Sequence, residues 1–503
     1  MSRASISIVA LLLSLMAQLG CGATEAPPPP PEPVTVGEEL PPEPEAPTKQ
    51  PPPESAPPRD LDFPATEKTA QANGLEVLMV PSDSLPVLYA QLVIRSGNAD
   101  SPEGRPGMAS LVAAMLEQGT KKKNAEQLAE AIEFLGADLR VSADADSLVI
   151  TIRALSEHLD QAIALLAEVA TQPSFDAKEL EKLKRRELNR LKLAATNPEY
   201  LARRAFYAAI YGDHPYANVD TTEDAVKAVT RKEVADWHAK HVLPNNAFLV
   251  VGGDFDRAAL EGTVQKAFAA WKPRALPERS ARAIPEAGKR RVLFIDRPES
   301  VQSAIRIGNL AIPRASEAWV PLEVANEVLG GSASARLFMD LREKRSFTYG
   351  AYSAVAERRD PGVFTAMAQV RNEVTVPAID AFFEHLERIV SEAPPEDELA
   401  DARNSLGNSF PLSIETMGRI VDLVTKRELY GLPADYWSTY RSAVRDVTPE
   451  QALEHAKRYI RPDEALIVVV GRAEDFAEPL RKWGPVTVVD AQGKVLRTLE
   501  AVE

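Results

Sequence analysis

From residue 72 onward, the hydrophobic positions follow two different periods, which predict a series of strands and helices. Short apolar runs between polar breaks indicate strands, and longer runs with apolar residues three and four positions apart indicate helices. On this basis we expect the following elements: strands at 73–82, 88–97 and 146–155, and helices at 105–120, 125–139, 159–171 and 178–194. We expect Gly119 to stop the first of these helices and Gly136 to stop the second. Because strands and helices alternate, we expect an α+β fold in which helices cover mixed sheets.

One pattern occurs twice at a fixed separation. Residues 230–253 and 448–472 each contain a helical run, a proline break and an apolar strand. Placing Thr230 on Thr448 also places Pro244 on Pro462 without a gap. We interpret this self-similarity as an internal duplication of a unit of roughly 220 residues. A stretch rich in Pro, Arg and Ala near 273–289 predicts the linker, so we expect two halves, 66–280 and 281–503.

The first 65 residues have a different pattern, typical of export and tethering. Arg3 precedes an apolar run, residues 6–16, that is too short to span a bilayer, which indicates a signal peptide over residues 1–21. The run ends at Gly20-Cys21, which resembles a bacterial lipoprotein signal and implies a lipid at Cys21. An ordinary signal peptide with an incidental cysteine is the alternative.

Residues 22–65 are rich in Pro and Glu and contain few large apolar side chains. Such a segment is expected to stay disordered because it has little to bury. About 40 residues in extended polyproline geometry reach on the order of 100 Å. We therefore expect a tether that holds the body away from a membrane of the bacterial cell envelope, on the periplasmic side or at the surface. A disordered leader without a set role is the alternative.

Composition narrows the classes of partner. The chain of 503 residues has a net charge of −15, which disfavours nucleic acid and anionic lipid because phosphates repel an acidic field. A single cysteine excludes disulfides and thiolate metal clusters within the chain. The length predicts two or more domains.

The richest stretch for function is 329–353. Gly330 and Gly331 end an apolar helical run, and we expect a left-handed turn there, because glycine supplies that conformation at helix ends. A second helix and a strand should follow. Arg342 lies near the end of that helix and Tyr349 at the start of that strand. Their polar tips can converge on one cleft.

This stretch, LGGSASARLFMDLREKRSFTYGAYS, resembles the C-terminal half of the insulinase/mitochondrial-processing-peptidase family of zinc metallopeptidases, the inverzincins. The resemblance extends over residues ~70–480 and implies two homologous halves of the metallopeptidase M16 type. In that family an Arg and a Tyr with this spacing hold the substrate, and Arg342 and Tyr349 match them. Gly330 and Gly331 resemble a loop implicated in peptide binding.

The same resemblance locates a degenerate metal site. The family carries His-x-x-Glu-His on a helix, in which the two His bind zinc and the Glu is the general base. This chain keeps the surrounding frame, from Gly107 to Gly119-Thr120, but has Ser110, Ala113 and Ala114 at the three motif positions.

The third zinc ligand of the family should fall near Asn189 or Arg190, with Glu187 nearby. Neither Asn nor Arg is a good zinc ligand, and Arg190 would repel the ion. We therefore expect no catalytic zinc and no cofactor in this chain.

Other candidate groups have simpler interpretations. His238 and His241 are three residues apart, but we expect a solvated helix end before a proline rather than a metal site. Isolated histidines on charged helices are expected at the surface: His158, His385 and His455. His214 resembles a structural loop of the family. Ser110 has no histidine partner nearby in sequence, which argues against a nucleophile.

Family members of this size pair as two-subunit assemblies, in some of which one subunit carries zinc and the other the Arg/Tyr pair. The resemblance therefore implies a non-catalytic, substrate-binding subunit that pairs with a zinc-bearing homologue and helps to enclose an unfolded peptide. The alternative is a structural or peptide-binding protein with no proteolytic partner. An active enzyme with an unrecognised site has no cluster of residues to support it.

Overall fold

The computed structural model describes residues 62–278, 283–286 and 288–502. The predicted signal peptide, Cys21 and most of the predicted tether lie outside these residues. The described chain from residue 62 belongs to one compact unit. None of its helices combines the length and the apolar character that a bilayer span requires.

The first half contains a six-stranded sheet in the order β1-β2-β6-β3-β5-β4. Only β2 and β6 pair in parallel, so the sheet is mixed. Its strands are β1 Glu67–Ala70, β2 Glu76–Pro81, β3 Val87–Ile94, β4 Asp138–Ala143, β5 Leu148–Leu155 and β6 Ala247–Gly253. Its helices are α2 Met108–Leu116, α3 Ala125–Phe134, α4 Leu159–Thr171, α5 Ala177–Ala194, α6 Pro198–Tyr211, α7 Glu223–Ala228, α8 Arg231–His241 and α9 Arg257–Phe268.

The second half contains a seven-stranded sheet in the order β13-β12-β7-β11-β8-β10-β9. Its strands are β7 Arg291–Asp296, β8 Gln302–Leu310, β9 Thr348–Val355, β10 Val363–Arg371, β11 Leu466–Gly471, β12 Val486–Val489 and β13 Val495–Leu499. Its α-helices are α10 Trp319–Asn326, α11 Arg336–Phe338, α12 Thr375–Ser391, α13 Glu396–Ser409, α14 Met417–Tyr430, α15 Tyr436–Arg445, α16 Pro449–Tyr459 and α17 Ala473–Phe476, and π-helical segments cover Glu327–Gly331 and Met339–Lys344.

The two sheets confirm the predicted duplication. The strand order β2-β6-β3-β5-β4 of the first half matches β7-β11-β8-β10-β9 of the second. In each, the strand that follows the proline break pairs in parallel with one neighbour and antiparallel with the other. The helix before that strand starts in both halves with a capping box, at Thr230 and at Thr448, which satisfies the free N–H groups of the first turn.

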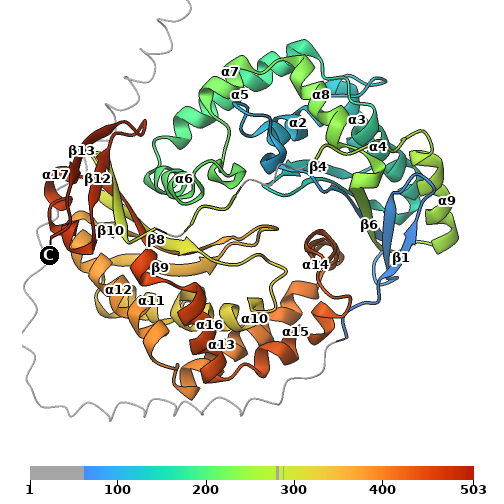
Figure 1. The fold of residues 1–503 in the computed structure, drawn as a ribbon. Helices are drawn as coiled ribbons and strands as arrows, with labels where there is room; N and C mark the ends of the chain where they lie inside the picture. The colour runs from blue at the N-terminus through green and yellow to red at the C-terminus, as the bar shows by residue number, and fades with distance from the viewer. Residues whose placement is uncertain (1–61, 279–282, 287, 503) are drawn as a thin grey trace, which may run out of the picture. The chain divides into compact units, whose positions relative to one another are not determined.

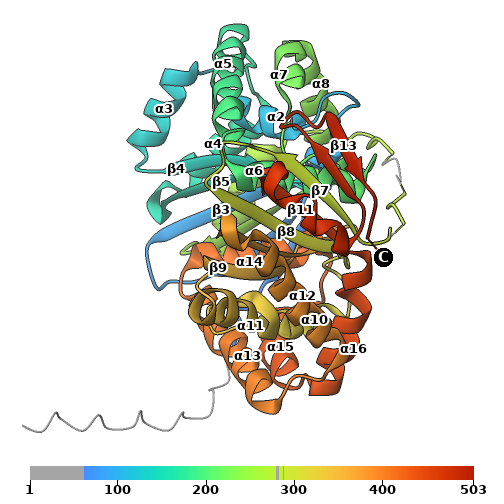
Figure 2. The same cartoon turned by 90° about the vertical axis from the view of Figure 1, so that its left-hand side faces the viewer.

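Each sheet is covered on one face by helices of its own half and on the other by a helix of the opposite half. On α6, Leu201, Phe206 and Ile210 are buried in one cluster with residues of β7, β8 and β11. On α14, Val421 and Val424 are buried against β2, β3 and β6. Figure 1 shows α6 beside the second sheet and α14 beside the first. Figure 2 shows the outer helices of the two halves on opposite sides of the sheets.

Close approach of α14 to the first sheet depends on a small residue. A Cβ atom on Gly252 would lie 2.5 Å from Sδ of Met417 and 2.7 Å from Cγ2 of Val421. These distances are shorter than van der Waals contact, so glycine in β6 allows the helix to seat. Ion pairs add to the contact at its edge, where Arg95 lies 2.8 Å from Glu428 of α14.

The pattern analysis misplaced one segment. The helix expected at 125–139 ends at Phe134, and residues 138–143 form β4 instead. Gly136 adopts a left-handed φ of 55°, which stops the helix and turns the chain into the strand. The expected stop at Gly136 is therefore confirmed, and only residues 138–139 of the predicted range lie in the edge strand β4.

Candidate functional site

The degenerate motif forms the helix that its frame predicts. Gly107 precedes α2 with φ of 79°, and a Cβ there would lie 2.7 Å from Cβ of Thr221. Ser110 is held by Asn98, whose Nδ2 donates to the serine Oγ at 2.8 Å. Ala113 is buried and Ala114 is half-buried, and neither side chain carries a donor atom. The fold of this helix is therefore kept, but its side chains do not fit a zinc ion.

Arg190 lies where the third ligand was expected, and it forms an ion-pair cluster. Its Nη atoms lie 2.7 and 2.9 Å from the two oxygens of Asp220, and its Nε lies 2.7 Å from Glu187. These hydrogen bonds, first to Asp220 and then to Glu187, raise the pKa of the Arg190 guanidinium above its ordinary value. A permanent cation thus occupies both nearby carboxylates. Among the described residues no group of three or more His, Cys, Asp or Glu could hold a metal ion.

Arg342 and Tyr349 both lie at the surface of the second half. The Arg342 guanidinium lies 4.7 Å from the ring centre of Phe338 and 3.6 Å from Glu343. Tyr349 is 90% exposed on β9, the edge strand of its sheet. Within the described chain no hydrogen bond joins the two side chains, so both keep donors that a ligand can reach. Their convergence on one cleft stays a prediction.

The expected left-handed turn at Gly330 and Gly331 is wrong. Gly330 has φ of −167°, and neither glycine has a positive φ. Space, not handedness, requires glycine here. A Cβ on Gly330 would lie 2.6 Å from Oγ of Ser353, and one on Gly331 would lie 2.1 Å from Oε2 of Glu327.

The loop after these glycines, residues 332–335, leads directly into α11. Ser405 of α13 donates a hydrogen bond of 2.7 Å to Glu327, whose carboxylate contacts Gly331. This partly buried hydrogen bond therefore links the end of the glycine segment to α13.

A cavity of about 1040 Å³ lies between the two halves, and we call it the inter-half cavity. From the first half it is lined by residues that include Gln91, Glu117 and Arg140, and from the second by Glu323, Glu357 and Asp422. The edge strand β4 contributes to its wall. The cavity thus combines an edge strand with charged side chains from both halves.

The second-half wall of this cavity is built around a buried arginine. Arg314 is 2% exposed, and its guanidinium lies 4.6 Å from the Trp319 ring centre and 4.9 Å from that of Tyr436. Its Nε donates to Glu357 at 3.0 Å, and Lys426 lies 2.7 Å from the same carboxylate. Burial opposes ionisation of Glu357, but these two cations hold its pKa below the ordinary value.

Glu323 is the less strongly paired carboxylate of this wall. It accepts a hydrogen bond of 3.1 Å from the hydroxyl of Tyr440. Burial raises the pKa of Glu323 to about 7. Sequence reasoning missed this wall because its residues come from distant segments. The only signal is a glutamate between Leu322 and Val324, inside an apolar helical run.

The histidines are more deeply packed than expected. The solvated helix end predicted for His238 and His241 is wrong, because Nε2 of His238 lies 2.8 Å from the Ala170 carbonyl and burial lowers its pKa to about 4. His241 is buried, and its Nδ1 lies 3.1 Å from Oγ of Ser96. The two rings contact different partners rather than one ion. The histidines expected at the surface are half-buried: His158, His385 and His455.

His214 lies in a structural loop that follows α6, as predicted. This loop helps to join the two halves. Nδ1 of His214 accepts from the backbone of Tyr216, whose hydroxyl bonds to the buried Asp146. The backbone N–H of Arg359, in the connection between β9 and β10, donates to the same carboxylate at 3.0 Å. One buried aspartate therefore ties loops of both halves together.

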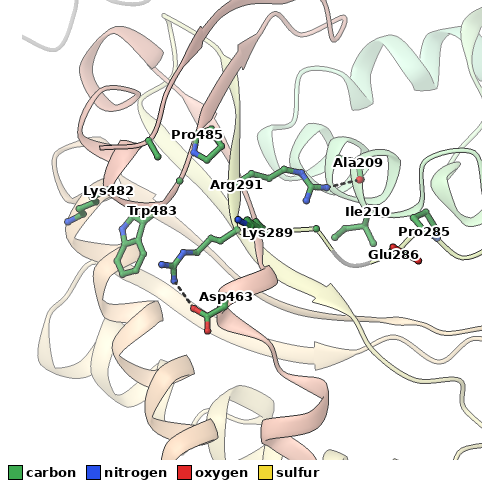
Figure 3. Close-up of a pocket in the computed structure, with 14 residues that line it drawn as sticks. Ala209, Ile210, Pro285, Glu286, Lys289, Arg291, Asp463, Lys482, Trp483 and Pro485 are labelled. Carbon is green, nitrogen blue, oxygen red and sulfur yellow. Dashed lines mark hydrogen bonds and ion pairs between the residues drawn. The ribbon is translucent and has the colours of Figure 1, made fainter. Parts of the chain in front are cut away.

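A second cavity, of about 950 Å³, lies where the linker meets α6 and the C-terminal region (Figure 3). Arg291 reaches towards α6 and donates to the Ala209 carbonyl at 3.1 Å. Arg290 lies 3.9 Å from Asp463 and 5.1 Å from the ring centre of Trp483. These cations are engaged in joining the linker to its surroundings, and none of the predicted site residues lines this cavity.

Comparison with known families gives two adjoining matches. The family described as insulinase (peptidase family M16) matches residues 77–221, and the peptidase M16 inactive domain matches residues 228–406. The two matches together cover most of the described chain, and the second begins within the first half, before β6, and ends within α13.

Similar proteins carry related descriptions. An uncharacterized zinc protease of Streptomyces coelicolor is 24% identical over 369 residues, which cover 72% of this chain and 80% of that protein. The non-peptidase homolog YmxG of Helicobacter pylori is 23% identical, over 77% of this chain and 89% of that protein.

Solved structures share the fold. A crystal structure of a peptidase M16 inactive domain from Pseudomonas fluorescens is 27% identical with a TM-score of 0.75, and the match covers 81% of this chain and 98% of that one. A protease from Helicobacter pylori is 19% identical with a TM-score of 0.77, covering 82% of this chain and 100% of that one.

Proposed function

Because the chain belongs to the insulinase family of M16 peptidases, we propose that it acts as the non-catalytic, substrate-binding subunit of a zinc peptidase of the bacterial cell envelope. Its partner is a homologue with an intact His-x-x-Glu-His motif, which supplies the zinc ion. The substrate is an unfolded peptide enclosed between the two subunits.

The observation that carries this proposal is the state of the motif helix. The frame of α2 is kept, but serine and two alanines stand at its chemical positions. Arg190, bound to Asp220 and Glu187, adds a fixed positive charge where a ligand to zinc is expected. A helix with this frame but without its imidazoles supports a homologue that keeps the fold and has lost the chemistry.

Two further features support peptide binding. Tyr349 and Arg342 are exposed hydrogen-bond donors, which suit a peptide carbonyl or a developing oxyanion near a metal in the partner. The edge strand β4 lines the inter-half cavity and has one unpaired side, to which an extended peptide can add as a further strand.

Attachment to a membrane is part of the same proposal. The signal-like residues 1–21 and the Pro/Glu-rich segment to residue 65 support a lipid at Cys21 and a tether. Metabolic labelling with a radioactive fatty acid tests this: Cys21→Ser should abolish labelling and release the protein from the membrane fraction. Labelling that persists in this variant would contradict the attachment.

The central test is reconstitution with the zinc-bearing homologue. The chain alone should contain no stoichiometric zinc and cleave no flexible fluorogenic peptide, whereas the pair should cleave it in a zinc-dependent way. Arg342→Ala and Tyr349→Phe should each lower activity of the pair. Matched controls on the same elements, Lys344→Ala and Tyr352→Phe, should leave it unchanged. Zinc-dependent cleavage by the lone chain would overturn the proposal.

Co-purification separates this proposal from a scaffold role. The chain should be recovered from cells with a zinc-bearing homologue of similar size. Recovery in a complex without such a homologue, or recovery alone, supports the scaffold alternative instead.

A further inference from the structure

We propose that the helix α5 binds the Pro/Glu-rich segment of the same chain, residues 22–61, through a basic face. This face is formed by four exposed side chains, Lys178, Arg185, Arg186 and Lys192. The inference goes beyond the proposed function, because it concerns how the folded body is held against its own N-terminal segment.

The charge of α5 distinguishes it from the rest of the chain. Its 18 residues include seven Lys or Arg and three Glu, in a chain with a net charge of −15. Its buried side chains are leucines: Leu180, Leu183 and Leu191. At about 100° per residue, the four cations of the basic face lie within an arc of about 120° on the side opposite these leucines. Figure 2 shows α5 on the outer side of the first half.

The cations of the basic face have no partner among the described residues, whereas the other cations of α5 do. Those others form ion pairs of 2.7–3.1 Å with carboxylates of the first half: Lys182 with Glu179, Lys184 with Glu181, and Arg190 with Glu187 and Asp220. Arg186 acts on Glu117, and Lys192 on Glu223, only at longer range. The basic face therefore keeps four positive charges for a partner.

The N-terminal segment has the complementary chemistry. Residues 22–48 contain six glutamates and no Lys or Arg. In polyproline geometry, at ~3.1 Å per residue, Glu38 and Glu45 would be about 22 Å apart. Lys178 and Lys192 are about 21 Å apart along the helix axis, at ~1.5 Å per residue. The cations of the basic face thus match, in number and in length, the closely spaced glutamates Glu38, Glu39, Glu43 and Glu45.

Covalent connection favours this occupant over a separate molecule. The 16 residues between Glu45 and Asp62 reach on the order of 50 Å when extended, which is close to the diameter of a compact body of this size. The strand β1, which follows them, belongs to the same half as α5. One exposed ion pair is weak. Four pairs formed at the effective concentration of a joined segment, on the order of millimolar, can hold together.

Cross-linking of the purified full chain with a water-soluble carbodiimide tests the contact, because this reagent joins a carboxylate only to an amine that touches it. We expect links from residues 38–45 to Lys178, Lys182 or Lys192, identified by mass spectrometry. An equal mixture of unlabelled and nitrogen-15-labelled chain distinguishes links within one copy from links between copies. Links within one copy are expected.

A double variant, Arg185→Gln with Arg186→Gln, leaves these lysines in place but removes half of the charge of the basic face. The yield of the links should fall roughly fivefold in this variant, and likewise in 0.5 M salt. The matched control, Arg203→Gln with Arg204→Gln on α6, changes two exposed arginines outside the basic face and should keep the yield. Absence of these links, links only between copies, or an unchanged yield in the α5 variant overturns the inference. Each of these results leaves the proposed function standing.

Discussion

Replacing Phe206 with alanine should destabilise both halves of the protein together. Phe206 belongs to the first half by sequence, but its side chain is fully buried in the cluster that covers the second sheet. Removing a buried phenylalanine costs about 3–5 kcal/mol, through lost apolar burial and the cavity left behind. Because α6 is the cover of the other half's sheet, this loss should not be confined to the half that carries the mutation.

Urea denaturation with a separate reporter in each half measures this effect. Trp237 is buried in the first half and Trp437 in the second, so fluorine labels on the tryptophans report both halves in one sample. In Phe206→Ala both signals should move to lower urea by the same amount and remain coincident. Phe134→Ala is the control, since Phe134 is 88% exposed and its loss should cost less than about 0.5 kcal/mol.

Two results would refute the reasoning. A decrease in the free energy of unfolding below about 1 kcal/mol would mean that α6 contributes little to the cover of the second sheet. If the two tryptophan signals changed at different urea concentrations, the halves would unfold independently. The packing of α6 and α14 on the opposite halves would then not couple their unfolding.

Three other substitutions test single contacts. Burial raises the pKa of Glu323 to about 7, so the stability linked to its protonated form is complete below pH ~4.5 and is lost as the pH rises through 7. In urea denaturation between pH 5 and 8, Glu323→Gln should flatten this decline in the free energy of unfolding. At pH 8 the variant should be more stable than the unmodified protein by up to about 3 kcal/mol. Arg190→Ala leaves Asp220 without its cation and should cost about 1 kcal/mol, less at high salt because the pair is partly exposed; an equal loss in 1 M salt would argue against an electrostatic origin. Gly330→Ala forces a Cβ to within 2.7 Å of the backbone nitrogen of Ser353 and should lower the thermal midpoint, with a cost of about 1–3 kcal/mol, and an unchanged midpoint would show that this position has room.

The repeated elements could be predicted because local signals mark them. Thr230 and Thr448 cap equivalent helices, and the prolines that follow end them at equivalent places, so periodicity and turn chemistry sufficed. The strand β4 was missed because its six residues, DLRVSA, alternate in exposure at a sheet edge and carry little apolar character. Such a strand forms through pairing with β5, which single-sequence patterns do not contain.

In the candidate site, too, features marked by local sequence could be predicted, whereas features that depend on tertiary contacts could not. The loss of the zinc motif is readable from Ser110, Ala113 and Ala114 alone, because it depends on residue types in a short frame. The wall around Glu323 is not readable, since Tyr440 approaches it from a helix more than one hundred residues later. The reason for the glycine pair was also tertiary, because it depends on the atoms that crowd each glycine rather than on its own φ angle.

The packing of α6 and α14 on opposite halves also restricts the route by which a peptide could reach the proposed binding site. Because α6 and α14 each pack against the sheet of the opposite half, the two halves of one molecule cannot separate without exposing two apolar surfaces. In the proposed complex, a peptide should therefore enter through the interface with the partner subunit. The rate at which that interface opens, rather than a hinge motion within this chain, would then limit the rate of peptide binding.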